Sequence, residues 1–255
     1  MSNAVVADFM RLFKSKTYAV VVPLTIVGYV LMLLIIEALL GRVYTDTFLY
    51  GDTDLRSYAQ YSPVVIAILV SIFQGSVFMD GTIRNRIISG NKRSTIFCSA
   101  CVVNAFMAFS YQIIATLSTI VFSYILLNGF ETPMAVIVVN ALIYAFAAAA
   151  LAVFFTMLVF ITAKGKLLTV IDPLLSVIVM VAAVFILDKL YPESGVCTLS
   201  ATVEKIFTFC DEYLPFFHLI GTVRWNLWDY AIGQVGFAVI SLVIGSVIFN
   251  TKEMN

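Results

Sequence analysis

The side chains that could carry redox or metal chemistry are few, because the chain has four cysteines and one histidine. Cys98 and Cys101 form a CxxC pair, but a redox pair of the thioredoxin type needs a βαβ context. The apolar run around them favours two buried thiols instead. His218 has no carboxylate, cysteine or second histidine at metal-ligand spacing, so we interpret it as a packing residue. These patterns predict neither a catalytic residue nor a metal site.

The other two cysteines, Cys197 and Cys210, have twelve residues between them in a segment that separates two apolar runs. If that segment faces an oxidising compartment, the spacing allows a disulfide that would stabilise the segment by about 3 kcal/mol. The sequence leaves open whether the two cysteines are free thiols or are joined by a disulfide.

Four polar side chains interrupt long apolar runs and are candidates for a transport pathway. Glu37 and Asp172 each lie about one or two helical turns from the end of a run, where a partly solvated carboxylate is the simpler interpretation. Gln112 and Asn140 lie deeper, where they line a path or hydrogen-bond a neighbouring helix. An enzyme acting inside a membrane needs a nucleophile with a base at depth, and this set contains none.

The composition places the chain in a bilayer. Of its 255 residues, 62% are hydrophobic and 12% are charged, whereas soluble domains are nearer half and a quarter. Fifteen basic residues balance fifteen acidic ones, which argues against a nucleic-acid partner because such a partner demands a basic face. We therefore predict an all-α polytopic membrane protein.

Six apolar runs are long enough to cross the hydrocarbon core of a membrane. They cover residues 18–40, 62–79, 95–127, 134–162, 167–187 and 231–249. An even number of spans puts both termini on one side, within a single transmembrane domain over residues 1–255. Ten of the fifteen basic residues fall in 1–17, 80–94, 163–166 and the stretch after 249. The remaining five lie in 41–61 and 188–230.

This charge bias predicts that both termini face the cytosol (N-in, C-in). It makes 80–94 a cytosolic loop and 188–230 an outer loop. We expect a multi-pass protein of the cell membrane, and a bacterial inner (cytoplasmic) membrane in particular.

Two short segments at the cytosolic side are amphipathic. In 80–94, Ile83, Ile87 and Ile88 are expected on one helix face, Arg84 and Arg86 lie elsewhere, and a glycine at position 90 ends the helix. Residues 1–17 likewise separate Phe9, Leu12 and Phe13 from Arg11, Lys14 and Lys16. Both segments could lie on the lipid surface, and the 80–94 helix could instead dock on a cytosolic protein.

Together these features resemble the permease subunits of type-2 ABC exporters over nearly the whole chain. The family's loop has an acidic residue, Gly-Thr, an aliphatic residue, Arg, an aliphatic pair, Gly and a basic cluster. The matching residues are Asp80, Gly81, Thr82, Ile83, Arg84, Ile87, Ile88, Gly90, Lys92 and Arg93. The outer loop is also similar at Tyr213-Leu214-Pro215-Phe216, and 201–209 could supply one of the short helices that precede the sixth span.

The resemblance implies a connector helix in 1–17 and a coupling helix in 80–94, seated in a groove of a separate ATPase. The docking residues would be Gly81, Ile83, Arg84, Arg86, Ile87 and Ile88. No GxxxxGK[ST] motif is present, so ATP and Mg²⁺ would be bound by the partner ATPase and this chain would hold no cofactor of its own. The assembly would contain two ATPase subunits and a second permease chain, identical or homologous.

We therefore expect a non-enzymatic permease subunit that forms half of an export pathway for an amphipathic or hydrophobic cargo such as a peptide. Two alternatives stay open. An ion-coupled secondary transporter would need a buried acidic or histidine relay and broken helices near the midplane. A non-transporting membrane sensor or immunity subunit would need neither an ATPase nor a pathway.

Overall fold

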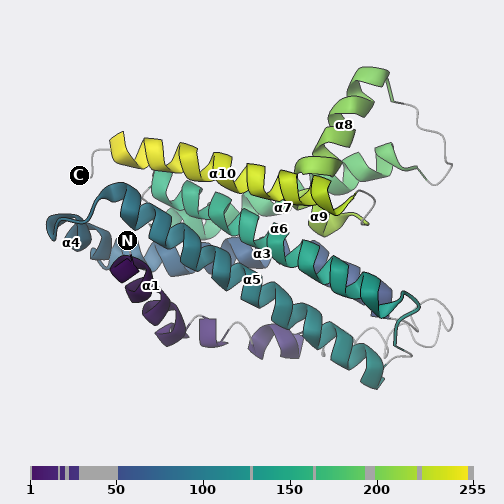
Figure 1. Ribbon diagram of the computed structural model, residues 1–255, viewed down its shortest axis with the longest axis horizontal. Coiled ribbons are helices and arrows are strands. Elements are labelled where there is room, and N and C mark those ends of the chain that lie inside the picture. The colour runs from purple at the N-terminus through teal and green to yellow at the C-terminus, as the bar shows by residue number, and fades with distance from the viewer. Residues whose placement is uncertain are drawn as a thin grey trace.

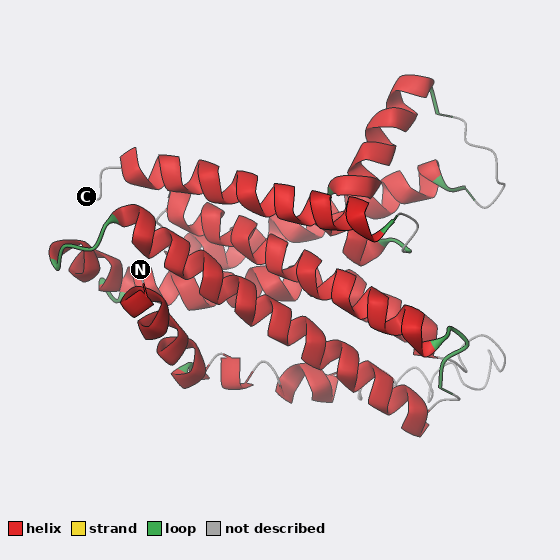
Figure 2. Cartoon of the chain, in the orientation of Figure 1, coloured by secondary structure: helices red, strands yellow, loops and turns green. Residues whose placement is uncertain are grey.

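The computed structural model describes residues 2–16, 18–20, 23–28, 51–126, 129–162, 165–192, 199–222 and 226–251. Every regular element in these ranges is a helix, and no strand occurs among them (Figure 2). The all-α prediction is confirmed for this part of the chain.

Five of the helices are long and apolar enough to cross a membrane. They are α3 (Gly51–Met79), α5 (Arg93–Leu126), α6 (Met134–Thr162), α7 (Gly165–Leu190) and α10 (Leu227–Thr251). At about 1.5 Å per residue each exceeds the roughly 30 Å of a hydrocarbon core. Such a set of helices indicates a multi-pass α-helical membrane protein.

The predicted spans agree with these helices to different degrees. The span 134–162 has the same bounds as α6, whereas α3 begins at Gly51, well before the predicted start at 62. The first predicted span, 18–40, is described only at 18–20 and 23–28, which are helical, and its other residues lie outside the described ranges. The sixth span and the N-in, C-in topology therefore stay predictions.

The early start of α3 depends on how the helix passes Pro63. Proline has no amide hydrogen, so the helical hydrogen bond to the Ala59 carbonyl cannot form. The Ser62 hydroxyl donates to that carbonyl at 2.7 Å instead. Counting apolar residues misses this extension, because the first turns of α3 are polar while still helical.

Helix α6 is the centre of the bundle, since α3, α5, α7, α9 and α10 all pack against it. Its run of small residues, including Ala147, Ala148 and Ala150, is buried and lets neighbouring helices approach closely. Figure 1 shows α5, α6 and α10 running side by side along the long axis of the molecule.

Shorter helices among the described residues lie at the two ends of this bundle (Figure 1). At one end are α1 (Ser2–Lys14) and α4 (Thr82–Ile88), together with the C-terminal end of α10. At the other end are α8 (Ala201–Tyr213) and α9 (Pro215–Ile220), where the Tyr191 hydroxyl donates to Asp211 at 2.8 Å. The short helices expected between 188 and 230 are thus present, and α8 includes the predicted 201–209.

Gly233 allows the backbones of α8 and α10 to approach each other closely. A Cβ atom built at Gly233 would lie 2.5 Å from the Tyr213 carbonyl oxygen, whereas one built at Gly236 has no atom within 4 Å. We expect Gly233→Ala to lower the free energy of unfolding by about 1–3 kcal/mol, because a backbone clash forces the helices apart. Gly236→Ala should be neutral or slightly stabilising. Thermal unfolding in detergent is the measurement, and equal melting temperatures for the two variants would contradict this packing.

Candidate functional site

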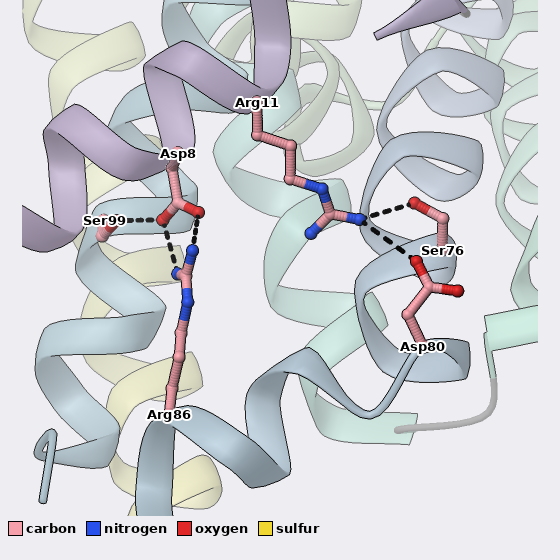
Figure 3. A network of polar contacts seen from close by, with 6 residues as sticks. All are labelled: Asp8, Arg11, Ser76, Asp80, Arg86 and Ser99. Carbon is pink, nitrogen blue, oxygen red and sulfur yellow. Dashed lines mark hydrogen bonds and ion pairs between the residues drawn. The ribbon is translucent and has the colours of Figure 1, made fainter. Parts of the chain in front are cut away.

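The N-terminal helix α1 is attached to α4 and α5 by a charged pair (Figure 3). The Arg86 guanidinium donates from Nη1 and Nη2 to the Asp8 carboxylate, at 2.9 and 2.6 Å. Ser99 of α5 donates to the same carboxylate. Asp8 is 6% exposed, so this fork-shaped pair is largely removed from water and is of the strong, charge-assisted kind.

One turn further along α1, Arg11 attaches the same helix to the end of α3. Its Nη2 donates to Ser76 at 2.9 Å and lies 3.8 Å from the Asp80 carboxylate (Figure 3). Its guanidinium also lies over the Phe73 ring, 5.5 Å from the centroid. Burial lowers the pKa of Arg11, and the Asp80 and Asp8 charges oppose that shift. We call Asp8, Arg11, Ser76, Asp80, Arg86 and Ser99 the α1–α4 clamp.

Two glycines set the bounds of α4. Gly81 precedes the helix with φ of 66°, and Gly90 follows it with φ of 87°. Both are left-handed conformations in which a side chain would be strained. The Gly90 amide donates to the Ile87 carbonyl at 3.0 Å and closes the last turn. The predicted end of the helix at Gly90 is confirmed.

The three isoleucines of α4 do not share one face, so that prediction is wrong. Ile83 is 2% exposed and packs in an apolar cluster with Val77, Phe97 and Phe249. Ile87 is half-buried against the same cluster, whereas Ile88 is 74% exposed. The reason is that positions 83 and 87 are one turn apart and face the bundle, while the next position is rotated outward.

The exposed surface of α4 is therefore smaller than predicted and carries positive charge. Arg84 and Lys92 are exposed, and no ion pair involves either among the described residues. Arg86, also expected to face a partner, is instead bound by Asp8. Ile88, Arg84 and Lys92 together form an apolar and basic surface at one end of the bundle.

The predicted pathway residues are spread over three helices. Gln112 on α5 and Asp172 on α7 are 1% and 0% exposed. Asn140 on α6 lines a cavity of about 460 Å³ with Asp52, Arg56 and other residues at the opposite end of α3 from the clamp, and neither Gln112 nor Asp172 lines it. Glu37 lies outside the described residues.

The cysteines and His218 agree with structural roles. Cys101 is buried and Cys98 half-buried within α5, as expected for packed thiols. Cys210 is half-buried on α8, but Cys197 lies outside the described residues, so the disulfide stays a prediction. No group of three or more His, Cys, Asp or Glu side chains suited to a metal occurs in the described ranges.

His218 is buried in α9 with a partner at each ring nitrogen. Its Nε2 lies 3.0 Å from the Glu212 carbonyl, and its Nδ1 lies 3.2 Å from the Gln234 amide nitrogen. No local pattern in the sequence points to Gln234 as a partner, because Gln234 lies on another helix. Burial lowers the pKa of His218 to about 4, and the hydrogen bond to the Glu212 backbone partly opposes that shift.

Comparison with known proteins leaves the chain without a match, since no family model, no curated protein and no solved structure matches it.

The lowered pKa of His218 predicts a pH dependence of stability. An unfolded histidine takes up a proton near pH 6.5 and the folded one near pH 4, so stability falls as the pH decreases through this window. The loss is at most about 3 kcal/mol. Melting temperatures measured from pH 7 to 4 should fall less steeply for His218→Gln than for the unsubstituted protein. Parallel curves for the two proteins would contradict the burial of a neutral imidazole.

The clamp predicts that Asp8 holds α1 in place. Asp8→Ala leaves the Arg86 guanidinium partly buried without its carboxylate, and we expect a cost of about 3 kcal/mol. Hydrogen exchange of the α1 amides should rise accordingly. Asp80→Ala is the matched control. The Asp80 side chain is 66% exposed and its ion pair with Arg11 is 3.8 Å long, so we expect its loss to cost at most about 1 kcal/mol of stability. Unchanged exchange in Asp8→Ala would show that the pair does not fix α1.

Proposed function

We propose that this chain is the permease subunit of a type-2 ABC exporter and that α4 docks on a separate cytosolic ATPase. The observation that carries the proposal is the attachment of α4. It is a seven-residue helix at the end of the bundle, fixed on its inner side and exposed on its outer side. A helix attached in this way can transmit the movement of a docked protein to the helices behind it.

Two separate contacts support this transmission. Ile83 is inserted in an apolar cluster built from α3, α5, α6 and α10, with Val77, Phe97, Phe160 and Phe249 among its members. Arg86 joins α4 to α1 through Asp8. Because packed interiors are hardly compressible, a displacement of α4 moves its neighbours rather than being absorbed between them.

The structure refines which residues of α4 we propose for docking. Ile88 and Arg84 are exposed, Ile87 is half-buried at the edge, and Gly81 sets the direction of the helix. Ile83 and Arg86 hold α4 from within the chain instead. An ATPase groove that is apolar at its base and acidic at its rim would complement Ile88 and Arg84.

The rest of the proposed assembly follows the resemblance. Two ATPase subunits bind ATP and Mg²⁺, and six spans with both termini in the cytosol form half of a pathway in a bacterial cytoplasmic membrane. A second permease chain, identical or homologous, supplies the other half. Exposed side chains of α7 at the spacing of a helix-pair seam, Leu174, Ile178, Val181 and Phe185, support a contact there. The cargo would be amphipathic or hydrophobic, such as a peptide.

An ion-coupled secondary transporter is the second candidate, and one observation favours it. Asp172 lies in a candidate membrane span and is 0% exposed. Pro173 follows it inside α7, so the helix lacks one backbone hydrogen bond beside the carboxylate. Co-purification of an ATPase separates the two candidates.

The docking role of α4 is tested by Ile88→Asp. The substitution places a charge on an exposed position, so folding should be preserved, while a charge in an apolar groove should weaken ATPase binding at least about 30-fold. The measurement is the stoichiometry of an ATPase subunit, identified by peptides containing its GxxxxGK[ST] motif, after purification from native membranes.

Asn85→Asp is the control, since it adds the same charge to another exposed position of α4 with little change of shape. We expect it to retain more ATPase than Ile88→Asp. If α4 merely rests on lipid, Ile88→Asp should weaken the contact of α4 with the membrane but leave the bound ATPase in place. A folded Ile88→Asp variant with unchanged ATPase stoichiometry would therefore refute docking through Ile88.

A further inference from the structure

A carboxylate lies in the contact between α3 and α7, and no ion pair among the described residues involves it. Asp172 of α7 is 0% exposed, and the Ser71 hydroxyl of α3 donates to its Oδ2 at 2.6 Å. Its other oxygen, Oδ1, is buried and has no hydrogen-bond partner among the described residues. Asp172 therefore has one strong donor where an ionised carboxylate usually has several.

A second oxygen atom without a hydrogen-bond partner among the described residues lies on the same face of α7 as Asp172. Ser176 is 0% exposed, and its Oγ has no hydrogen-bond partner among the described residues. It follows Asp172 by four residues, which places the two side chains one helical turn apart. Three oxygen-bearing side chains, Asp172, Ser71 and Ser176, are thus buried in this part of the bundle. We call them the Asp172 site.

The Asp172 site lies within the candidate membrane spans. Ser71 precedes the end of α3 by eight residues, or about 12 Å of helix. Asp172 lies three residues after the start of the α7 span at Thr169. An ionised carboxylate that is buried without a charged partner is costly, so ionisation without compensation is unfavourable here.

The helices that pack on α7 provide no compensating positive charge in their described side chains. On α3, Arg56 lies fifteen residues before Ser71, and Asp52 lies further away. The titratable side chains of Tyr58 and Tyr61 lie between Arg56 and Ser71 in the sequence. Helix α6 has no charged residue, and Tyr144 is its one titratable group. The titratable groups of α8 and α9, including Asp211 and His218, lie at the opposite end of α7, as do Asp188 and Lys189. The side chains of Lys164 and Lys166 are outside the described set.

We propose that the Asp172 site binds one monovalent cation, a proton or Na⁺, between α3 and α7. One carboxylate matches one positive charge, whereas a divalent ion would leave a net charge buried in the bilayer. A proton would sit on Oδ1 and make the group neutral. Na⁺ would be held by oxygen atoms alone, which suits a carboxylate and two hydroxyls.

Occupancy of the Asp172 site sets how well α7 packs on α3. With a cation bound the site is neutral, and without one an ionised carboxylate is left in an apolar contact. Pro173 lies directly beside the site and weakens α7 at that point, so the helix can bend there when the site empties. The inference does not depend on ATPase docking, because a cation site is compatible with both candidate functions.

Infrared spectroscopy of the protein in lipid nanodiscs tests the site, since a protonated carboxyl and a carboxylate absorb at separate frequencies. Asp172→Asn identifies the signal of Asp172 by difference. If the cation is a proton, we expect a protonated carboxyl at pH 5 in Na⁺-free buffer that persists when Na⁺ is added. If it is Na⁺, the addition of Na⁺, but not of choline, should change the signal. An Asp172 that titrates near pH 4 and does not respond to Na⁺ would overturn the proposal.

Ser176→Ala provides a second test that keeps the carboxylate and changes little in volume. We expect the pH or Na⁺ concentration of half-occupancy to shift about tenfold, because one of the site's oxygens is lost. Ser241→Ala is the matched control, since the Ser241 hydroxyl already donates to the Phe237 carbonyl within α10 and is not part of the site. Equal titrations of Ser176→Ala and Ser241→Ala would exclude Ser176 from the site. Docking of α4 predicts that Asp172→Asn leaves the ATPase stoichiometry unchanged. Measuring that stoichiometry therefore separates the cation-site proposal from the docking proposal.

Discussion

A chain that passes through hydrocarbon must satisfy its polar groups from within, because no water is there to bind them. This constraint accounts for the helical structure of the five candidate spans, since a helix pairs its own backbone. It also explains local detail. Where Pro63 removes a backbone donor from α3, the Ser62 hydroxyl replaces it, and in α5 the Ser118 and Thr119 hydroxyls donate to carbonyls of their own helix.

The same constraint sends charge to the ends of the bundle, where it acquires specific partners. Asp8 and Arg86 form a fork-shaped pair because α1 packs on α5 within reach of the Arg86 side chain of α4. Removal of either partner leaves a charge that is neither solvated nor paired, so the two helices are held in one arrangement. The exposed part of α4 is then the part that another protein could reach. Position within the fold, more than residue type, separates Arg84 from Arg86.

The sequence predicts the length of a helix better than it predicts which face of that helix points into the bundle. Apolar run length located α6 to the residue, because no polar turn extends it. Helical periodicity found α4 but not which side faces the bundle, since the cluster that takes Ile83 comes from helices distant in sequence. Asp8 and Arg86 are 78 residues apart, so no local pattern could pair them. Asp172 was expected near solvent, and it is buried because α3 covers that face of α7.

Helix α3 takes part in both the α1–α4 clamp and the Asp172 site. Ser76 of α3 accepts a hydrogen bond from Arg11 in the clamp, and Ser71 of the same helix donates to Asp172. The two serines are five residues apart, or about 7.5 Å along one rigid helix. A displacement of α3 along its axis would therefore move both contacts together.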